Sequence, residues 1–263
     1  MTTVVGAVGR WVLSVLAAWL EVVALMVATA HWLLVAPFRG KGLRVRAAVE
    51  HLVEFGFRSL PIVGTICFLI GVIIALQSSY TLEQWGANRF IANLVAVGGL
   101  RELAPLMTAI LITGRSGSAI TAEIGTMKVG EEVDALEVMG INPVKYLVVP
   151  KFLGMLVAVP CVTLVAMFIM IFGGWVAAVL IVGVQSGVYI DQTAAALVEK
   201  DLLTGLTKSV FFGIVICWVG VYRGFAVSGG AAGVGRETTS SVVTSIFLII
   251  VVDLVFTVLF YFV

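Results

Sequence analysis

Two adjacent residues of opposite charge, Arg101 and Glu102, lie well inside an apolar run, Phe90–Thr113, that is long enough to cross a membrane. A charged side chain in the middle of a span costs about 3 kcal/mol unless it faces protein or water, so it is a functional candidate by default. Neighbouring residues on a helix do not face one another, and we expect each to have its own partner. The pair therefore predicts a functional polar site within the membrane, and the alternative is a structural network near one membrane face.

A GRSG sequence at 114–117 matches the GxSG pattern around the nucleophile of rhomboid-type intramembrane proteases. A nucleophilic Ser116 would need a general base, normally a histidine, to accept its proton. The two histidines, His31 and His51, both precede it, and neither lies in a later span. The protease hypothesis therefore lacks its base, and small residues that allow tight helix packing are the favoured interpretation.

An acidic segment follows, with apolar and acidic residues at helical spacing. Four apolar or small residues share one helical stripe: Val129, Val133, Leu136 and Gly140. Four acidic residues largely face elsewhere: Glu131, Glu132, Asp134 and Glu137. A solvated surface helix would explain this pattern. A coupling helix that docks into another protein explains it too, and also suits the position between two spans.

Nucleotide-binding and metal-binding patterns are absent from the sequence. Gly40-Lys41 lacks the following Ser or Thr of a phosphate-binding loop, and Lys208-Ser209 lacks the preceding glycine. We therefore expect no cofactor in this chain, and any ATP with its magnesium would be bound by a separate subunit. Three cysteines stand in apolar runs without a close cysteine neighbour, as small buried hydrophobes do: Cys67, Cys161 and Cys217.

Composition sets the class of protein that must position these residues. Apolar residues make up 61% of the chain and charged residues only 12%, with a mean hydropathy of +1.15. A soluble domain is typically about half apolar and roughly a quarter charged. The chain is therefore predicted to be an all-α integral membrane protein with one domain, 1–263. A net charge of +1 neither favours nor excludes nucleic acid, and we expect no nucleic-acid partner.

Five membrane spans are expected within a core at 60–262: Leu60–Tyr80, Phe90–Thr113, near 151–172, about Ser209–Tyr222, and Val242–Phe262. The third apolar run, Leu147–Val182, would measure about 54 Å as one helix, too long for a single crossing. We expect it to break at Pro160 or at Gly173-Gly174, with a re-entrant piece after the break. Residues 185–208 are expected to form a polar excursion outside the membrane.

The N-terminal part, 10–58, precedes these spans. Residues 11–36 are apolar but contain Glu21 and His31, so the segment either spans the membrane or lies in its interface. The amphipathic stretch 47–61 is expected on the cytoplasmic surface, entering the membrane at Pro61. With loop 37–59 inside, most basic residues lie inside, as the positive-inside rule requires, and the C-terminus lies outside. The three basic residues then expected outside are Arg89, Lys200 and Lys208.

Two stretches carry a resemblance to a known family: LRELAP at 100–105 and GRSGSAITAEIGTMKVGEEVDALEVMGINPVKYLVVPKF at 114–152. Here the chain resembles the MlaE/YrbE family of ABC-type permeases, the membrane subunits of MCE lipid-transport systems, over nearly its whole length. The resemblance implies a homodimer in the bacterial inner membrane, with two cytoplasmic ATPase subunits and a periplasmic MCE-domain protein. A small STAS-domain protein often accompanies them. It also implies a lipid substrate, usually phospholipid, and an interfacial N-terminal helix.

Two groups of residues take roles from the resemblance. A lipid pocket at the dimer interface, open to the periplasm, would be lined by Ile73, Leu76, Gln77, Tyr80, Arg101 and Glu102. Ile73 and Leu76 would contact acyl chains. Segment 123–140 would be the coupling helix that enters a groove on the ATPase, and the residues expected to carry this contact are Glu123, Gly125, Met127, Glu131, Glu132, Asp134 and Glu137.

The expected protein is thus a permease subunit of an ATP-driven lipid transporter and not itself an enzyme. One alternative from another class is an ion- or proton-coupled secondary transporter or channel that uses Arg101 and Glu102 as its ion site. The intramembrane protease is a more remote alternative. Dependence of activity on a co-purifying ATPase distinguishes the first alternative from the permease.

Overall fold

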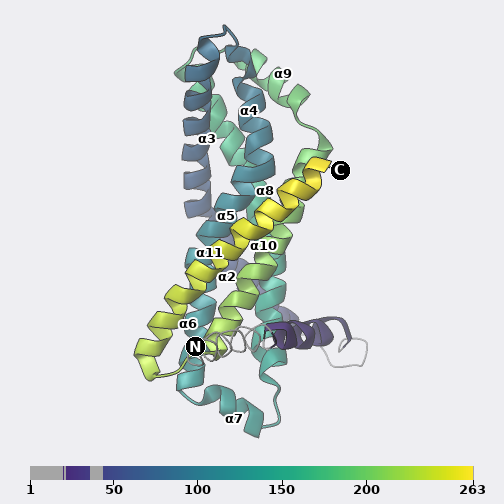
Figure 1. Cartoon of the computed structure of the whole chain (residues 1–263), viewed down its shortest axis with the longest axis vertical. Helices are drawn as coiled ribbons and strands as arrows, with labels where there is room; N and C mark the ends of the chain where they lie inside the picture. Colours follow the sequence, from purple (N-terminus) through teal and green to yellow (C-terminus); the bar gives the residue numbers. More distant parts are fainter. Residues whose placement is uncertain (1–19, 21, 36–43, 263) are drawn as a thin grey trace, which may run out of the picture.

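The computed structural model describes residue 20, residues 22–35 and residues 44–262, and the regular structure in these ranges is helical. The helices form an elongated bundle, with the short helix α7 at one end (Figure 1). Within the described ranges, five helical segments are long and apolar enough to cross a membrane: Val45–Glu83, Asn88–Val129, Val144–Leu180, Glu199–Phe225 and Gly230–Phe262. Helices suit this environment because they satisfy every backbone polar group internally. The predicted all-α fold with five spans is confirmed.

The first span combines α2 (Val45–Phe55), a 3-10 turn (Phe57–Ser59) and α3 (Leu60–Glu83). Both α2 and α3 pack along α8. A Cβ added at Gly154 of α8 would lie 2.9 Å from the Cβ of His51, so α2 approaches α8 very closely. Entry into the membrane at Pro61 stays a prediction, and α2 already contacts α8 before that point, with Phe55 buried and Val49 and Val53 50% and 49% exposed.

The second span is one helical run from α4 (Ile91–Gly98) through α5 (Ala104–Ile112) to α6 (Ser118–Val129). Two π-helical turns connect these parts, Gly99–Leu103 and Thr113–Gly117. The span was expected to end at Thr113, but the helix continues beyond it. The chain widens into a π turn there and continues as a helix, and such turns are often found at functional sites.

The third span continues from a π turn (Val144–Val148) into α8 (Val149–Leu180) without a break. The predicted interruption at Pro160 or Gly173-Gly174, with a re-entrant piece, was wrong. Gly173 lies against the backbone of Phe68 in α3, and Gly71 of α3 lies against the backbone of Met170. These glycines let two helices approach closely rather than break one of them, as small residues do in membrane bundles.

The last two spans are longer than expected. After α9 (Ser186–Ala196), helix α10 runs from Glu199 to Phe225 and α11 from Gly230 to Phe262, crossing the bundle obliquely (Figure 1). The polar excursion expected over 185–208 therefore ends near Ala196. Lys208, expected outside the membrane, lies inside the fourth span and has no exposed surface. Its burial is possible because carboxylates surround it, as described below.

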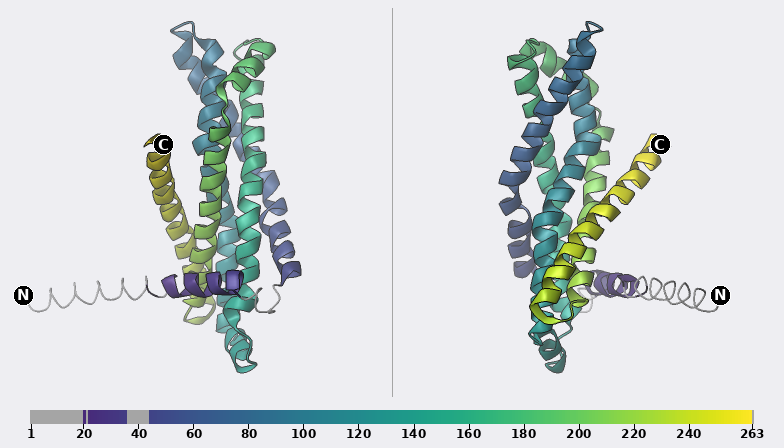
Figure 2. Two further views of the ribbon diagram at one scale, coloured as in Figure 1. Left: turned by 90° about the vertical axis from the view of Figure 1, so that its right-hand side faces the viewer. Right: turned by 60° about the vertical axis from the view of Figure 1, so that its left-hand side comes forward.

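The described part of the N-terminal segment contains a short apolar helix, Val22–Leu33. It runs across the long axis of the bundle rather than along it (Figure 2). This orientation favours the interfacial interpretation over a membrane span. Glu21 and the tryptophans Trp11 and Trp19 lie outside the described residues.

The close packing of α3 on α8 generates a testable prediction. Gly71→Ala would place a Cβ against the backbone carbonyl of Met170, which cannot move aside as a flexible side chain can. We expect this variant to lose about 1–3 kcal/mol of stability, seen as a lower midpoint of thermal unfolding in detergent. Gly98→Ala is the matched control, because a Cβ there meets nothing within 4 Å. Equal unfolding midpoints for the two variants would contradict the packing argument.

Candidate functional site

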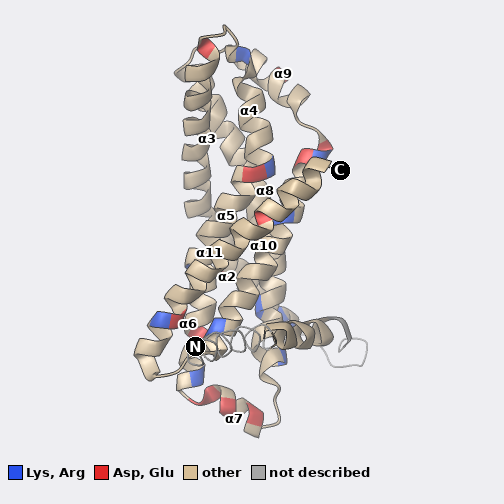
Figure 3. Cartoon of the chain, viewed as in Figure 1, with Lys and Arg blue, Asp and Glu red and all other residues tan. Residues whose placement is uncertain are grey.

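A network of charged side chains joins three of the five spans. Figure 3 shows it as a patch of blue and red partway along the bundle, set within largely uncharged helices. The π turn Gly99–Leu103 supplies two of its members, α10 two and α11 two: Arg101, Glu102, Asp201, Lys208, Asp253 and Thr257.

Lys208 is the centre of this network. Its ammonium nitrogen donates to Glu102 Oε2 and, at 2.8 Å, to Thr257 Oγ1, and it lies 2.9 Å from Asp253 Oδ1. The contacts with Glu102 and Thr257 are hydrogen bonds, whereas the contact with Asp253 is an ion pair without hydrogen-bond geometry. One fully buried cation thus stands between two carboxylates, which leaves a net negative charge on this part of the network.

Arg101 makes a separate pair. Its guanidinium donates to Asp201, whose other carboxylate oxygen accepts from the backbone N–H of Val198 at 3.1 Å and so caps the start of α10. The prediction that Arg101 and Glu102 bind different partners is confirmed. Their side chains are 40% and 36% exposed, whereas Asp201 and Lys208 are buried. The network therefore has a buried centre and an accessible edge, where a polar group of a ligand can reach charged side chains.

Sequence reasoning did not identify four members of this network. Asp201 and Lys208 were assigned to a polar excursion, and Asp253 and Thr257 were not singled out within the apolar run 242–262. An acidic residue inside a predicted span was the available signal for Asp253. The spacing of Asp201 and Lys208, two helical turns apart on one face, was a second signal that their helix continues into the membrane.

Four residues expected to line the lipid pocket form an exposed stripe on α3: Ile73, Leu76, Gln77 and Tyr80. Ile73 is 61% exposed and Tyr80 71%, so this chain alone does not cover them. The hydrogen bonds and ion pairs described for Arg101 and Glu102 run to α10 and α11 instead. The two halves of the expected pocket are thus separate in one chain, and a pocket at an interface with a second copy stays a prediction.

The expected coupling helix over 123–140 is two helices rather than one. Helix α6 ends at Val129, Glu131 adopts a left-handed backbone conformation with φ of 58°, and α7 spans Glu132–Val138. Glu123 and Gly125 belong to the bundle rather than to its protruding end, because Glu123 pairs with buried Lys151 at 2.7 Å and Gly125 packs on Val227. Met127, also in α6, packs against a small apolar cluster under α7.

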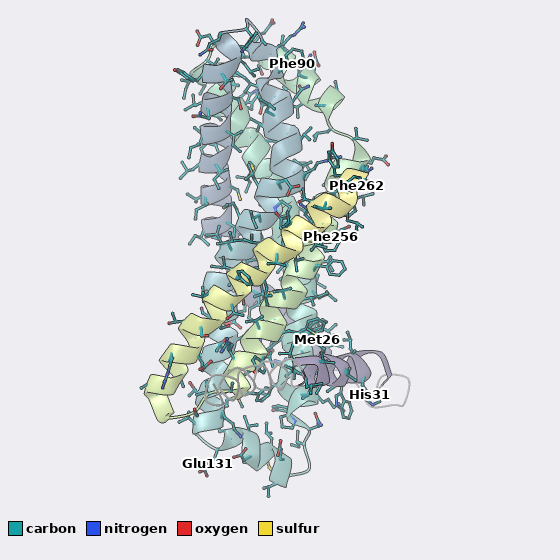
Figure 4. The ribbon with its side chains drawn as sticks, in the orientation of Figure 1. Met26, His31, Phe90, Glu131, Phe256 and Phe262 are labelled. Carbon is teal, nitrogen blue, oxygen red and sulfur yellow. The ribbon has the colours of Figure 1, made fainter. Side chains whose placement is uncertain are left out.

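Helix α7 projects from the end of the bundle, and Figure 4 marks Glu131 at its start, far from Phe90. Val133 and Leu136 are buried, as their stripe predicted, whereas Val129 is 42% exposed. The predicted acidic residues face outward: Glu131, Glu132, Asp134 and Glu137. Just beyond them Val138 and Met139 are 88% and 64% exposed. An apolar tip with an acidic edge is suited to docking against another protein.

The remaining candidate residues do not support a catalytic or metal-binding role. Ser116 is buried, and the described contacts of His51 go to Lys151, Glu54 and Phe55. Within the described ranges no group of His, Cys, Asp and Glu is arranged to hold a metal ion. Two cysteines, Cys67 and Cys217, are buried as expected, and Cys161 is exposed.

The network generates a prediction about stability. Lys208→Met would leave the carboxylates of Glu102 and Asp253 without their shared cation. Removing one partner of a buried pair costs about 3–5 kcal/mol, so the unfolding midpoint in detergent should fall strongly. Lys200→Met, an exposed change on the same helix, should have little effect. Similar midpoints for both variants would show that Lys208 does not hold the spans together.

Comparison with known proteins identifies the family to which the chain is similar. The family model described as Permease MlaE matches residues 48–259. A probable ABC transporter permease protein of Rickettsia prowazekii is 37% identical over 81% of this chain and 82% of its own length. The intermembrane phospholipid transport system permease protein MlaE of Haemophilus influenzae is 32% identical over 80% of both chains. The chloroplastic protein TRIGALACTOSYLDIACYLGLYCEROL 1 of Arabidopsis thaliana is 32% identical over 82% of this chain and 62% of its own.

The matched region covers all but the outermost three residues of the first and fifth spans, together with the charged network and α7. The resemblance noted at 100–105 and 114–152 is thereby confirmed, and the chain is a non-catalytic transport component that crosses the membrane several times. It belongs to the MlaE family of ABC transporter permeases.

Proposed function

We propose that this chain is the membrane subunit of an ATP-driven transporter that moves phospholipid between the bacterial inner membrane and a periplasmic MCE-domain carrier. Family membership and the phospholipid named for the Haemophilus influenzae relative support the substrate. The observation that carries the mechanism is the uninterrupted helical run Asn88–Val129, which is 42 residues long. It holds Arg101 and Glu102 and leads, through the turn at Gly130, to α7.

That helical run offers a mechanical connection between the two ends of the molecule. A force applied to α7 would move a helix whose far part carries two of the six residues of the charged network, Arg101 and Glu102. The other four, on α10 and α11, would then shift relative to it, because Asp201 and Lys208, the ionic partners of Arg101 and Glu102, belong to a different helix, α10. Opening or closing the accessible edge of the network in this way would change its hold on a bound headgroup.

A cytoplasmic ATPase is the partner we assign to α7. The chain has no phosphate-binding loop of its own, so ATP and magnesium belong to that partner. The exposed tip of Val138 and Met139 supplies apolar contact area, and Glu131, Glu132 and Glu137 surround it with negative charge. A groove with an apolar floor and a basic edge would be complementary to it.

The lipid pocket we propose lies between two copies of this chain. Lipid sites need apolar walls and a few polar groups that orient the head. The exposed stripe of α3 offers apolar Ile73 and Leu76 beside polar Gln77 and Tyr80. Arg101, with a part-exposed guanidinium, is suited to a phosphate because its donors match phosphate geometry. A homodimer through this face would cover the stripe and bring it towards both networks.

The orientation we propose puts α7 in the cytoplasm and α9 on the periplasmic side. Basic residues gather near the α7 end (Figure 3). With Lys208 now inside the bundle, the basic residues left for the outside are Arg89 and Lys200, which strengthens the positive-inside bias. The C-terminus would then be periplasmic, the MCE-domain protein would meet the α9 end, and a STAS-domain protein would sit with the ATPase.

Docking of the ATPase gives one prediction. Glu132→Lys reverses a charge on the exposed face of α7 and should reduce the amount of ATPase that co-purifies with this chain, without lowering its unfolding midpoint. Glu83→Lys, the same change on an exposed residue at the far end of α3, is the matched control. Co-purification of the ATPase at normal yield with Glu132→Lys would count against the coupling role.

Headgroup binding gives another prediction. Arg101→Ala removes the guanidinium from the accessible edge, and we expect the phospholipid retained per purified complex to fall several-fold, as measured by lipid mass spectrometry. Arg89→Ala removes an exposed arginine that lies outside the network and should leave the lipid content unchanged. Equal lipid content in the two variants would place the transport pocket elsewhere.

A further inference from the structure

The accessible edge of the charged network presents a cation beside an anion. Arg101 and Glu102 come from the same π turn, and their side chains are 40% and 36% exposed. This edge lies partway along the bundle, among helices that are largely uncharged (Figure 3). A ligand that reaches it therefore meets both signs of charge at one place.

Arg101 keeps donors free for such a ligand. Its hydrogen bond to Asp201 uses Nε, and no described residue accepts a hydrogen bond from its two terminal nitrogens. Neither terminal nitrogen is a buried atom that lacks a partner, so both are open to solvent. Together they carry four N–H groups in a plane, which match the oxygens of a phosphate. Asp201 thus holds the guanidinium by one nitrogen and leaves its other side available.

The network as a whole carries more negative than positive charge. Lys208 is shared by Glu102 and Asp253. Arg101 pairs with Asp201. Two cations therefore face three carboxylates, and in their ordinary ionised forms one negative charge is left without a cation. Of the two carboxylates around Lys208, Glu102 is the more exposed, at 36% against 16% for Asp253, so a ligand reaches the uncompensated charge chiefly at Glu102.

We infer that this edge selects a phospholipid whose zwitterionic headgroup ends in a primary ammonium, as in phosphatidylethanolamine, over an anionic phospholipid. The inference rests on the proposed function, because it assigns a headgroup to the transported lipid. The phosphate accepts from the terminal nitrogens of Arg101, and the ammonium donates to the carboxylate of Glu102. The ammonium then supplies the positive charge that the network lacks.

The spacing of the two charges suits this headgroup. Arg101 is held by Asp201, and Glu102 is held by Lys208. Asp201 and Lys208 are two helical turns apart, roughly 10 Å along α10. A phosphate and an ammonium joined by two carbons, with a hydrogen bond of about 2.8 Å at each end, span a similar length. A carboxylate has about four acceptor positions, so Glu102 can accept from the ammonium in addition to Lys208 and Thr257.

Other headgroups fit the edge less well. The phosphate of phosphatidylglycerol can also bind Arg101, but it brings a second uncompensated negative charge next to Glu102. Like charges repel strongly where little water screens them. Phosphatidylcholine keeps the positive charge, but its nitrogen has no N–H to donate to Glu102. The expected order of preference is therefore phosphatidylethanolamine, then phosphatidylcholine, then phosphatidylglycerol.

Lipid retention by the purified complex tests this inference. The complex is reconstituted into liposomes that contain equal amounts of these three phospholipids with identical acyl chains. It is then extracted in mild detergent, and the phospholipids that remain bound are quantified by mass spectrometry. We expect the ratio of retained phosphatidylethanolamine to phosphatidylglycerol to exceed that of the liposomes several-fold.

Glu102→Gln is the decisive variant. It removes the exposed negative charge but leaves Lys208 paired with Asp253, so the fourth and fifth spans keep their ionic contact. We expect the retained ratio to fall to that of the liposomes, while Arg101 still holds phospholipid through its phosphate. A role of Glu102 in structure alone would change the amount of lipid but not the ratio between headgroups.

Two further variants complete the test. Glu50→Gln is the matched control, because it neutralises an exposed carboxylate of α2 that pairs with Arg46, and it should keep the enrichment. Asp253→Asn removes the uncompensated charge from the less exposed side of Lys208. It should raise the retention of phosphatidylglycerol and so lower the ratio, which keeps the test decisive if Glu102→Gln does not fold.

Two results would overturn the inference and leave the proposed function in place. One is retention of the three phospholipids in the proportions of the liposomes by the unaltered complex. The other is undiminished enrichment of phosphatidylethanolamine in a folded Glu102→Gln complex, which would place the discrimination elsewhere. Retention of no phospholipid at all would overturn the proposed function, and this inference with it.

Discussion

One buried cation, Lys208, connects three helices of the bundle through its charged and polar contacts. Its ammonium group contacts Glu102 from the second span and Asp253 and Thr257 from the fifth, while its own helix is the fourth. Membrane helices gain little from apolar contact with one another, because lipid tails are equally apolar. The buried charge of Lys208 therefore determines which faces of the three helices pack together. Removing it leaves the carboxylates of Glu102 and Asp253 in a low-dielectric environment without a cation.

Ion pairs between helices also occur elsewhere in the bundle. Nearer α7, buried Lys151 of α8 pairs with Glu123 of α6, and Arg223 of α10 pairs with Glu237 of α11. Elsewhere in the bundle, glycines bring α3 and α8 into backbone contact. Helix Asn88–Val129 contributes to the network, to the Lys151 pair and to the turn before α7, so it is the element through which the two ends of the protein are connected.

The candidate site was predictable in part. Arg101 and Glu102 stood out because charge inside an apolar run is costly, and their separate partners followed from helix geometry. Asp201 and Lys208 were missed because the polar residues around them, from Glu199 to Lys208, made that stretch look external. In the structure these same residues form the first turns of α10, where Asp201 and Lys208 are buried by their ionic partners on other helices. Hydropathy along the sequence shows that a charged residue is unfavourable inside a membrane, but it does not show which distant residue pairs with it.

The amino-acid sequence alone determined that the chain is a helical membrane protein with five spans, that it resembles the MlaE family of ABC-type permeases, and that α7 has a buried and an acidic face. These properties depend on local composition, periodicity and motif, which each short stretch carries by itself. Only the tertiary structure decided that Pro160 and Gly173 lie inside one continuous helix, that segment 123–140 divides at Gly130, and that Lys208 is the buried centre of the network. These depend on contacts between residues far apart in the chain, whose energies no local pattern contains.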